Sequence, residues 1–131
     1  MIARSDLRKI ARARLRDAEV LLDKRRYDGA IYLCGYSVEV ALKARICRAL
    51  RWTEFPETAR EFDGYKSLRT HRLDVLLHFS GEETRIKTRL MPEWSIVATW
   101  EPEVRYRRVG KAKAGDAADM VQAARNVVAA L

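Results

Sequence analysis

The chain has 131 residues, of which 48% are hydrophobic and 34% charged, so it suits one folded domain and excludes both a disordered polymer and a membrane-spanning protein. Lysine and arginine outnumber aspartate and glutamate by 26 to 18, and the formal net charge at pH 7 is +8. This excess favours a polyanionic partner, because each basic side chain placed on a phosphate releases counterions. A small domain can also be basic without any such partner, since charge alone does not identify one.

We expect a cytoplasmic protein without a membrane segment. The charged N-terminal residues 1–16 are followed by no apolar segment of the kind a secretory signal needs. Cys34 and Cys47 fall in one predicted helix, where their Cα atoms would lie about 20 Å apart. A disulfide requires less than about 7 Å, so the two thiols cannot bridge within one chain, which fits a reducing compartment.

The first predicted helix runs from Ser5, a suitable N-cap, to about Lys24. Its apolar residues recur at spacings of three and four, which places them on one face: Leu7, Ile10, Ala11, Leu15, Ala18 and Leu22. Arg8, Arg12 and Arg16 lie four residues apart on another face. The pattern predicts an amphipathic helix with a positively charged stripe.

A second helix is expected after the break at residues 25–28, ending near Leu50. Its first half is apolar almost all round, which is typical of a central helix that packs on more than one side. Gly35 in the middle of that helix predicts the close approach of another backbone. Glycine inside a helix lowers its stability, so its presence there suggests that a larger side chain would not fit. Glu39 would need a basic partner when buried, either Lys43 or Arg105 from another helix.

The remaining elements are shorter. Residues 52–67 read as an irregular connection, after which Thr70 can cap a third helix running from His71 to about Phe79. Ser80 and Glu83 have the spacing of a capping box that opens the next helix. Pro92 should interrupt that helix or restart it as a first turn, and Pro102 should end it.

The last part of the chain combines a basic loop with a final helix. The loop spans residues 104–115 and carries five basic side chains and no acidic one. It is followed by a helix capped by Asp116 that runs to Leu131. Trp94 and Trp100 are expected in the core or at a dimer interface, as is Trp52. Together these elements predict an all-α, antiparallel up-and-down bundle of four to five helices, forming one domain over residues 1–131.

Three motifs resemble the HEPN domain family (higher eukaryotes and prokaryotes nucleotide-binding). Residues 18–46, AEVLLDKRRYDGAIYLCGYSVEVALKARI, are similar to its opening helical hairpin. RTHRLDVLL resembles a Thr-His-x-Leu segment of the family, and EVRY resembles its later Arg-Tyr element. The three occur in the same order as in the family.

The resemblance implies a helical bundle that forms a homodimer and acts in the cytoplasm without a cofactor. Members include RNA-cutting toxins, nuclease modules of RNA-guided defence systems and partners of small nucleotidyltransferases in toxin–antitoxin pairs. Active members carry Arg-x(4-6)-His and form a metal-independent RNase site between two copies. The Arg-Tyr form goes with members that lack this nuclease motif.

In this chain the spacing Arg-x(4-6)-His occurs at Arg72 and His78. His78 could act as a general base or acid on a 2′-hydroxyl group, with Arg72 stabilising the charge on phosphorus. The alternative is a solvated arginine and a histidine at a helix end. His71, Asp74 and His78 would share one helical stripe, but the two histidines would be about 10 Å apart, too far for one metal ion.

The basic loop provides the second candidate site, for nucleic acid or a nucleotide. It combines a ring that can stack on a base with clustered basic groups, and its residues are Arg105, Tyr106, Arg107, Arg108 and Lys111. We assign His71, from the third predicted helix, to the same candidate site. The alternative is that Tyr106 packs on the bundle and the arginines are solvated. The leading hypothesis is a module that binds RNA or a nucleotide and that acts together with a partner protein. The alternatives are a metal-independent RNase or a purely structural interaction protein.

Overall fold

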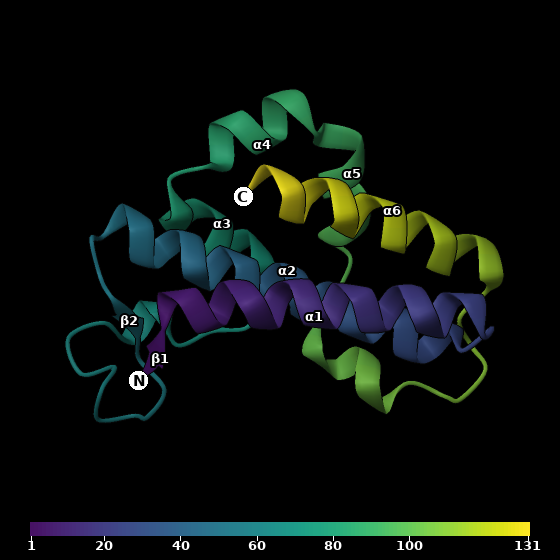
Figure 1. Ribbon diagram of the computed structural model, residues 1–131, viewed down its shortest axis with the longest axis horizontal. Helices are drawn as coiled ribbons and strands as arrows, with labels where there is room; N and C mark the ends of the chain where they lie inside the picture. The colour runs from purple at the N-terminus through teal and green to yellow at the C-terminus, as the bar shows by residue number, and fades with distance from the viewer.

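The computed structural model describes residues 1–131 and is helical almost throughout (Figure 1). The six α-helices are α1 (Arg4–Asp23), α2 (Tyr27–Ala49), α3 (Leu73–Ser80), α4 (Glu83–Arg89), α5 (Met91–Val97) and α6 (Ala114–Ala130). Two 3₁₀ helices, η1 (Lys66–Leu68) and η2 (Pro102–Tyr106), and two short strands complete the chain. The all-α prediction is confirmed, with six helices rather than four or five because residues 73–97 divide into three short ones.

The two long helices form an antiparallel hairpin that runs the length of the molecule (Figure 1). Helix α6 lies along this hairpin, α3 packs on α2, α5 packs on α6, and α4 connects α3 to α5. The strands β1 (Ile2–Ala3) and β2 (Glu54–Phe55) pair antiparallel where α1 begins and α2 ends. No helix combines the length and the apolar character that crossing a membrane requires.

Helix α2 is the centre of the core, as its sequence predicts. Its buried residues face all sides of the helix, whereas α1 buries only Leu7, Ala11 and Ala18. Cys34 and Cys47 are both buried and free. Burial raises the pKa of Cys34 to about 12 and that of Cys47 to about 11, so both behave as apolar core side chains.

The predicted N-caps of the first and last helices are wrong. Helix α1 begins at Arg4 rather than after Ser5, and the Arg4 amide donates to the Thr53 carbonyl oxygen at 2.9 Å. The β1–β2 pairing therefore determines where α1 starts. Helix α6 begins at Ala114, so Asp116 lies inside its first turn, where a negative charge favours the helix dipole but no side-chain cap forms.

The predicted start of the third helix also differs. Helix α3 begins at Leu73, and Thr70 accepts a hydrogen bond from the Arg72 amide at 3.1 Å in the turn that precedes it. His71 therefore lies outside the helix, and the expected stripe of His71, Asp74 and His78 does not form. The predicted inward face of Leu73, Leu76 and Leu77 is confirmed, since all three are buried.

Ser80 and Glu83 do not form a capping box. Ser80 is the last residue of α3, is buried, and donates to the Leu77 carbonyl oxygen at 2.6 Å. The Ser80 hydroxyl also accepts a hydrogen bond from the Glu82 amide at 3.1 Å. Ser80 therefore forms its hydrogen bonds at the C-terminal end of α3 and is not the N-cap of α4. Pro92 restarts the chain in the first turn of α5, as expected.

The close approach predicted at Gly35 is made by an aromatic ring rather than by a backbone. A methyl group added at Gly35 would lie 2.1 Å from atoms of the Trp100 indole, so only glycine leaves room for this ring. Trp94 and Trp100 are buried in the core, whereas Trp52 is partly exposed. The packing of Trp100 on Gly35 holds the segment that leads into η2 against α2.

Candidate nucleic-acid interface

The predicted basic loop forms an exposed surface, which we call the loop surface (Arg105–Lys111). Tyr106 is 77% exposed, and the Arg105 guanidinium carbon lies 4.9 Å from the centre of its ring. Arg107 and Arg108 are also exposed. The alternative in which Tyr106 packs on the bundle is therefore wrong.

The loop surface is attached to the first two turns of α2. The Asp28 carboxylate accepts hydrogen bonds from the Gly110 amide at 2.7 Å and from the Ala112 amide at 3.1 Å. Interaction with the Tyr32 hydroxyl, and to a smaller extent with Tyr106, raises the pKa of Arg105 above its ordinary value. Asp28 thus holds the backbone of the loop at Gly110 and Ala112, while Arg105, Arg107 and Arg108 are exposed.

His71 lies elsewhere, beside the middle of α2. Its Nδ1 atom lies 2.8 Å from a carboxylate oxygen of Glu39, whose side chain is only 3% exposed. The other Glu39 oxygen accepts from Lys43 at 3.4 Å. Of the two partners expected for Glu39, Lys43 is confirmed and Arg105 is wrong. The His71 contact was missed, because nothing in the spacing of residues 39 and 71 indicates it.

Arg72, which directly precedes α3, and His78, in its last turn, are both exposed. Arg72 pairs with Asp74 at 3.1 Å, and the His78 Nδ1 atom lies 3.9 Å from a Glu83 oxygen. Each side chain therefore has an acidic neighbour, and neither lines the arginine-rich cleft described below. Their assignment as catalytic residues stays a prediction.

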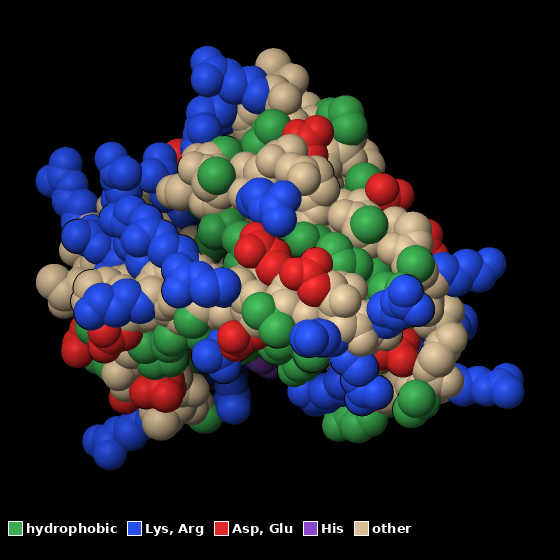
Figure 2. All heavy atoms as spheres, turned by 45° about the vertical axis from the view of Figure 1, so that its right-hand side comes forward, with side chains coloured by type: hydrophobic (Ala, Val, Ile, Leu, Met, Phe, Trp, Pro, Cys, Tyr) green, Lys and Arg blue, Asp and Glu red, His purple; other side chains and the backbone are tan.

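A second basic site lies in a cleft between α1, α2 and α6, which we call the arginine cleft. Its volume is about 460 Å³, and six arginines line it: Arg4, Arg8, Arg12, Arg45, Arg48 and Arg125. Figure 2 shows basic side chains gathered on this side of the molecule. Arg4, Arg8, Arg12 and Arg48 have no carboxylate partner, whereas Arg125 lies 3.1 Å from Glu19.

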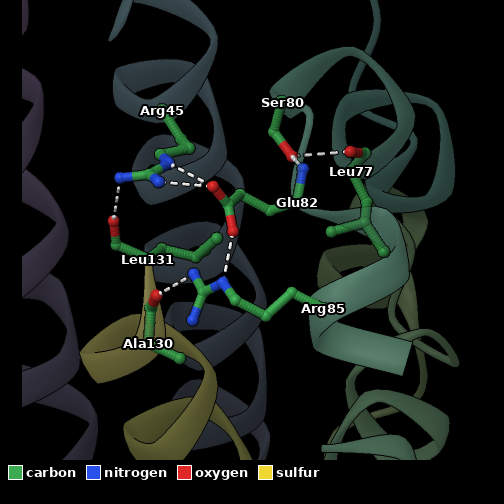
Figure 3. A network of polar contacts seen from close by, with 7 residues as sticks. All are labelled: Arg45, Leu77, Ser80, Glu82, Arg85, Ala130 and Leu131. Carbon is green, nitrogen blue, oxygen red and sulfur yellow. Dashed lines mark hydrogen bonds and ion pairs between the residues drawn. The ribbon is translucent and has the colours of Figure 1, made fainter. Parts of the chain in front are cut away.

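A polar network lies behind Arg45, one of the residues that line the arginine cleft (Figure 3). The Glu82 carboxylate accepts hydrogen bonds from both Arg45 and Arg85, while these arginines also donate to the carbonyl oxygens of Leu131 and Ala130. Burial alone would raise the pKa of Glu82, but the two arginines outweigh it and hold this pKa below its ordinary value. The network fixes Arg45 in place and offsets the negative end of α6.

The two basic surfaces lie at opposite ends of the hairpin. The loop surface is bound to Asp28 in the first turn of α2, and the cleft includes Arg45 and Arg48 near its last turn. About 17 residues of helix separate these positions, a distance of roughly 25 Å. Of the predicted stripe of Arg8, Arg12 and Arg16, the first two line the cleft and Arg16 does not. Nothing in the sequence indicates that Arg125 joins them.

Comparison with known proteins identifies the hairpin. The HEPN domain family matches residues 5–59, which cover α2, β2 and nearly all of α1. This match confirms the HEPN resemblance over these residues, while the Thr-His-x-Leu and Arg-Tyr segments lie beyond it. No curated protein and no solved structure gives a significant match to the chain.

Proposed function

We propose that this HEPN-type module binds RNA or a nucleotide at the loop surface and acts together with a partner protein. The observation that carries the proposal is the exposed Tyr106 ring, which Arg105 supports from a position 4.9 Å from its centre. Arg107, Arg108 and Lys111 follow it in the chain, and no acidic residue lies between positions 105 and 111.

The two kinds of side chain serve two parts of a nucleotide. An exposed aromatic ring stacks on an unpaired base, a contact worth about 1–3 kcal/mol, and arginines bind the neighbouring phosphates. Because Asp28 holds the loop backbone by two hydrogen bonds, little ordering entropy remains to be lost when the ligand binds. Support for a nucleotide or RNA ligand also comes from the HEPN match.

The biological setting follows from the family resemblance. We infer a cytoplasmic homodimer that works in a toxin–antitoxin or defence system, with a small nucleotidyltransferase as the partner. The net charge of +8 is consistent with such an RNA-related role.

The test is the affinity for a short fluorescein-labelled oligouridylate, measured by fluorescence anisotropy. Tyr106→Ala should weaken binding about fivefold to a hundredfold, in line with the loss of one stacking contact. Tyr106→Phe keeps the ring and should bind like the wild type, which makes it the matched control. Equal affinities for wild type and Tyr106→Ala, with both proteins folded by circular dichroism, would refute the proposal.

The RNase alternative needs a separate assay, because it uses Arg72 and His78. Pure protein is incubated in EDTA with labelled single-stranded RNA and tRNA beside the His78→Ala variant. Cleavage that disappears in the variant would establish a metal-independent nuclease. Cleavage retained in His78→Ala would refute the catalytic assignment, and intact RNA with the wild type would leave a binding module or an enzyme that depends on its partner.

A further inference from the structure

The arginine cleft has an unusually simple chemical composition. Its lining consists of the six arginines and seven apolar residues: Ala11, Leu15, Ala41, Ala44, Val128, Ala129 and Leu131. The lining side chains therefore include no aromatic ring, no carboxylate, no amide and no hydroxyl group. An apolar floor and a cationic rim are the only features that it offers to a ligand.

This composition suits RNA poorly. Proteins recognise unpaired bases by stacking on aromatic rings and by hydrogen bonds to the base edges, and the cleft side chains provide no ring and no hydrogen-bond acceptor. The rim could contact phosphates, but the apolar floor would then remain uncovered. Both the ring and the polar surroundings that RNA requires are found at the loop surface instead.

An acidic amphipathic helix matches both parts of the cleft. Such a helix places apolar side chains in a groove and carboxylates along its edges, which is the helix-in-groove mode of recognition. We propose that the arginine cleft is the docking site for an acidic amphipathic helix of a partner protein. The proposal concerns a different surface from the one that is proposed to bind RNA.

The shape of the cleft supports a helix as the occupant. Four of the floor residues are alanines, contributed by α1, α2 and α6, so a fourth helix can approach closely. Arg4, Arg8 and Arg12 follow one another at one-turn intervals, which corresponds to a rise of about 6 Å. Acidic residues four apart on a docked helix repeat with the same rise, so successive pairs can form along the rim.

The charges of the cleft are available for pairing. Arg4, Arg8 and Arg12 are exposed and, like Arg48, have no carboxylate neighbour within ion-pair distance. The Glu82 carboxylate accepts a hydrogen bond from the Arg45 guanidinium group and holds it against the wall of the cleft. Arg125 is paired with Glu19, so four of the six arginines are left without an internal partner. A rim with these unpaired charges is electrostatically complementary to an acidic helix and repels a basic one.

The experiment uses a synthetic labelled peptide of about 18 residues, or five helical turns, with leucine on one face and glutamate on the others. A scrambled peptide of the same composition has the same charge without the apolar face. The full-length protein should bind the amphipathic peptide at least tenfold more tightly than the scrambled one. Equal binding of the two peptides would show a simple polyanion surface and overturn the proposal.

Two pairs of variants locate the site. Arg8→Ala with Arg12→Ala removes two rim charges and should weaken peptide binding about fivefold to twentyfold, with little effect on oligouridylate. The matched control, Arg107→Ala with Arg108→Ala, removes the same charge from the loop surface and should show the opposite pattern.

The floor is tested within one helix. Ala129→Gln places a polar side chain in the cleft and should weaken peptide binding, whereas Ala118→Gln, at an exposed position of α6 outside the cleft, should not. Unchanged peptide affinity in both cleft variants would refute the proposal. Loss of oligouridylate binding in the Arg8 and Arg12 variant, with no loss in the loop control, would instead place RNA in the cleft and contradict both proposals.

Discussion

Replacing Gly35 by alanine should destabilise the fold, because the added methyl group would collide with the Trp100 indole. The new Cβ atom would lie 2.1 to 2.2 Å from three ring atoms, far inside the optimal carbon–carbon separation of about 3.5–4.0 Å. Overpacking of this kind costs about 1–3 kcal/mol or more, and the better helix propensity of alanine returns about 1 kcal/mol. We expect a net loss near the upper end, about 2 kcal/mol.

The assay is thermal unfolding followed by circular dichroism. For a domain of this size, 2 kcal/mol corresponds to a fall in Tm of about 8 °C. Gly29→Ala in the same helix is the matched control, since its Cβ would meet only the flexible tip of Leu21 at 3.1 Å. This control should keep or raise the Tm.

A double variant separates the collision from any effect on the helix. In a Trp100→Ala background the ring is absent, so adding Gly35→Ala should no longer destabilise the protein. The same decrease in Tm with and without the ring would refute the packing of Trp100 on Gly35. It would also remove the structural reason for the position of η2 and of Arg105.

Three further predictions concern the polar network, the thiols and the loop. Because the folded-state pKa of Glu82 is lowered, its stabilising effect is complete above the ordinary glutamate pKa of about 4.3 and is lost as the pH falls through the lower folded value. Glu82→Gln should cost about 2 kcal/mol at pH 7 and reduce the loss of stability on acidification, and equal urea midpoints for the two proteins would contradict this. The raised pKa values of Cys34 and Cys47 predict that Ellman's reagent labels neither thiol in native protein near pH 7.5 and both in denaturant; rapid native labelling would show that they are accessible. Asp28→Ala should increase tryptic cleavage in the loop and weaken oligouridylate binding a few-fold without lowering the Tm, and unchanged proteolysis would show that these hydrogen bonds do not hold the loop.

The helical fold was predictable because its main signals are local and periodic. The apolar face of α1, the apolar character of α2 and the inward leucines of α3 all follow from side-chain spacing and are confirmed. Helix starts were less predictable, since they depend on distant partners. Thr53 fixes the start of α1 through a backbone hydrogen bond that no residue near Ser5 indicates.

The candidate sites were predictable only in part, for the same reason. The exposed ring and guanidinium groups of the loop surface can be recognised from the residues themselves. The contact between His71 and Glu39 joins positions 32 residues apart, and the arginine cleft requires α6 to return beside α1. Such arrangements depend on tertiary packing, which the periodicity of one segment does not contain.

The measurement that tests the central claim most directly is the salt dependence of oligouridylate binding. Each phosphate contact on a single strand contributes about 0.7 to the slope of log K against log salt concentration. We predict that Arg107→Ala with Arg108→Ala reduces this slope by about 1.4, while Arg8→Ala with Arg12→Ala leaves it unchanged. A wild-type slope near zero, or the same slope in the Arg107 and Arg108 variant as in the wild type, would contradict RNA binding at the loop surface.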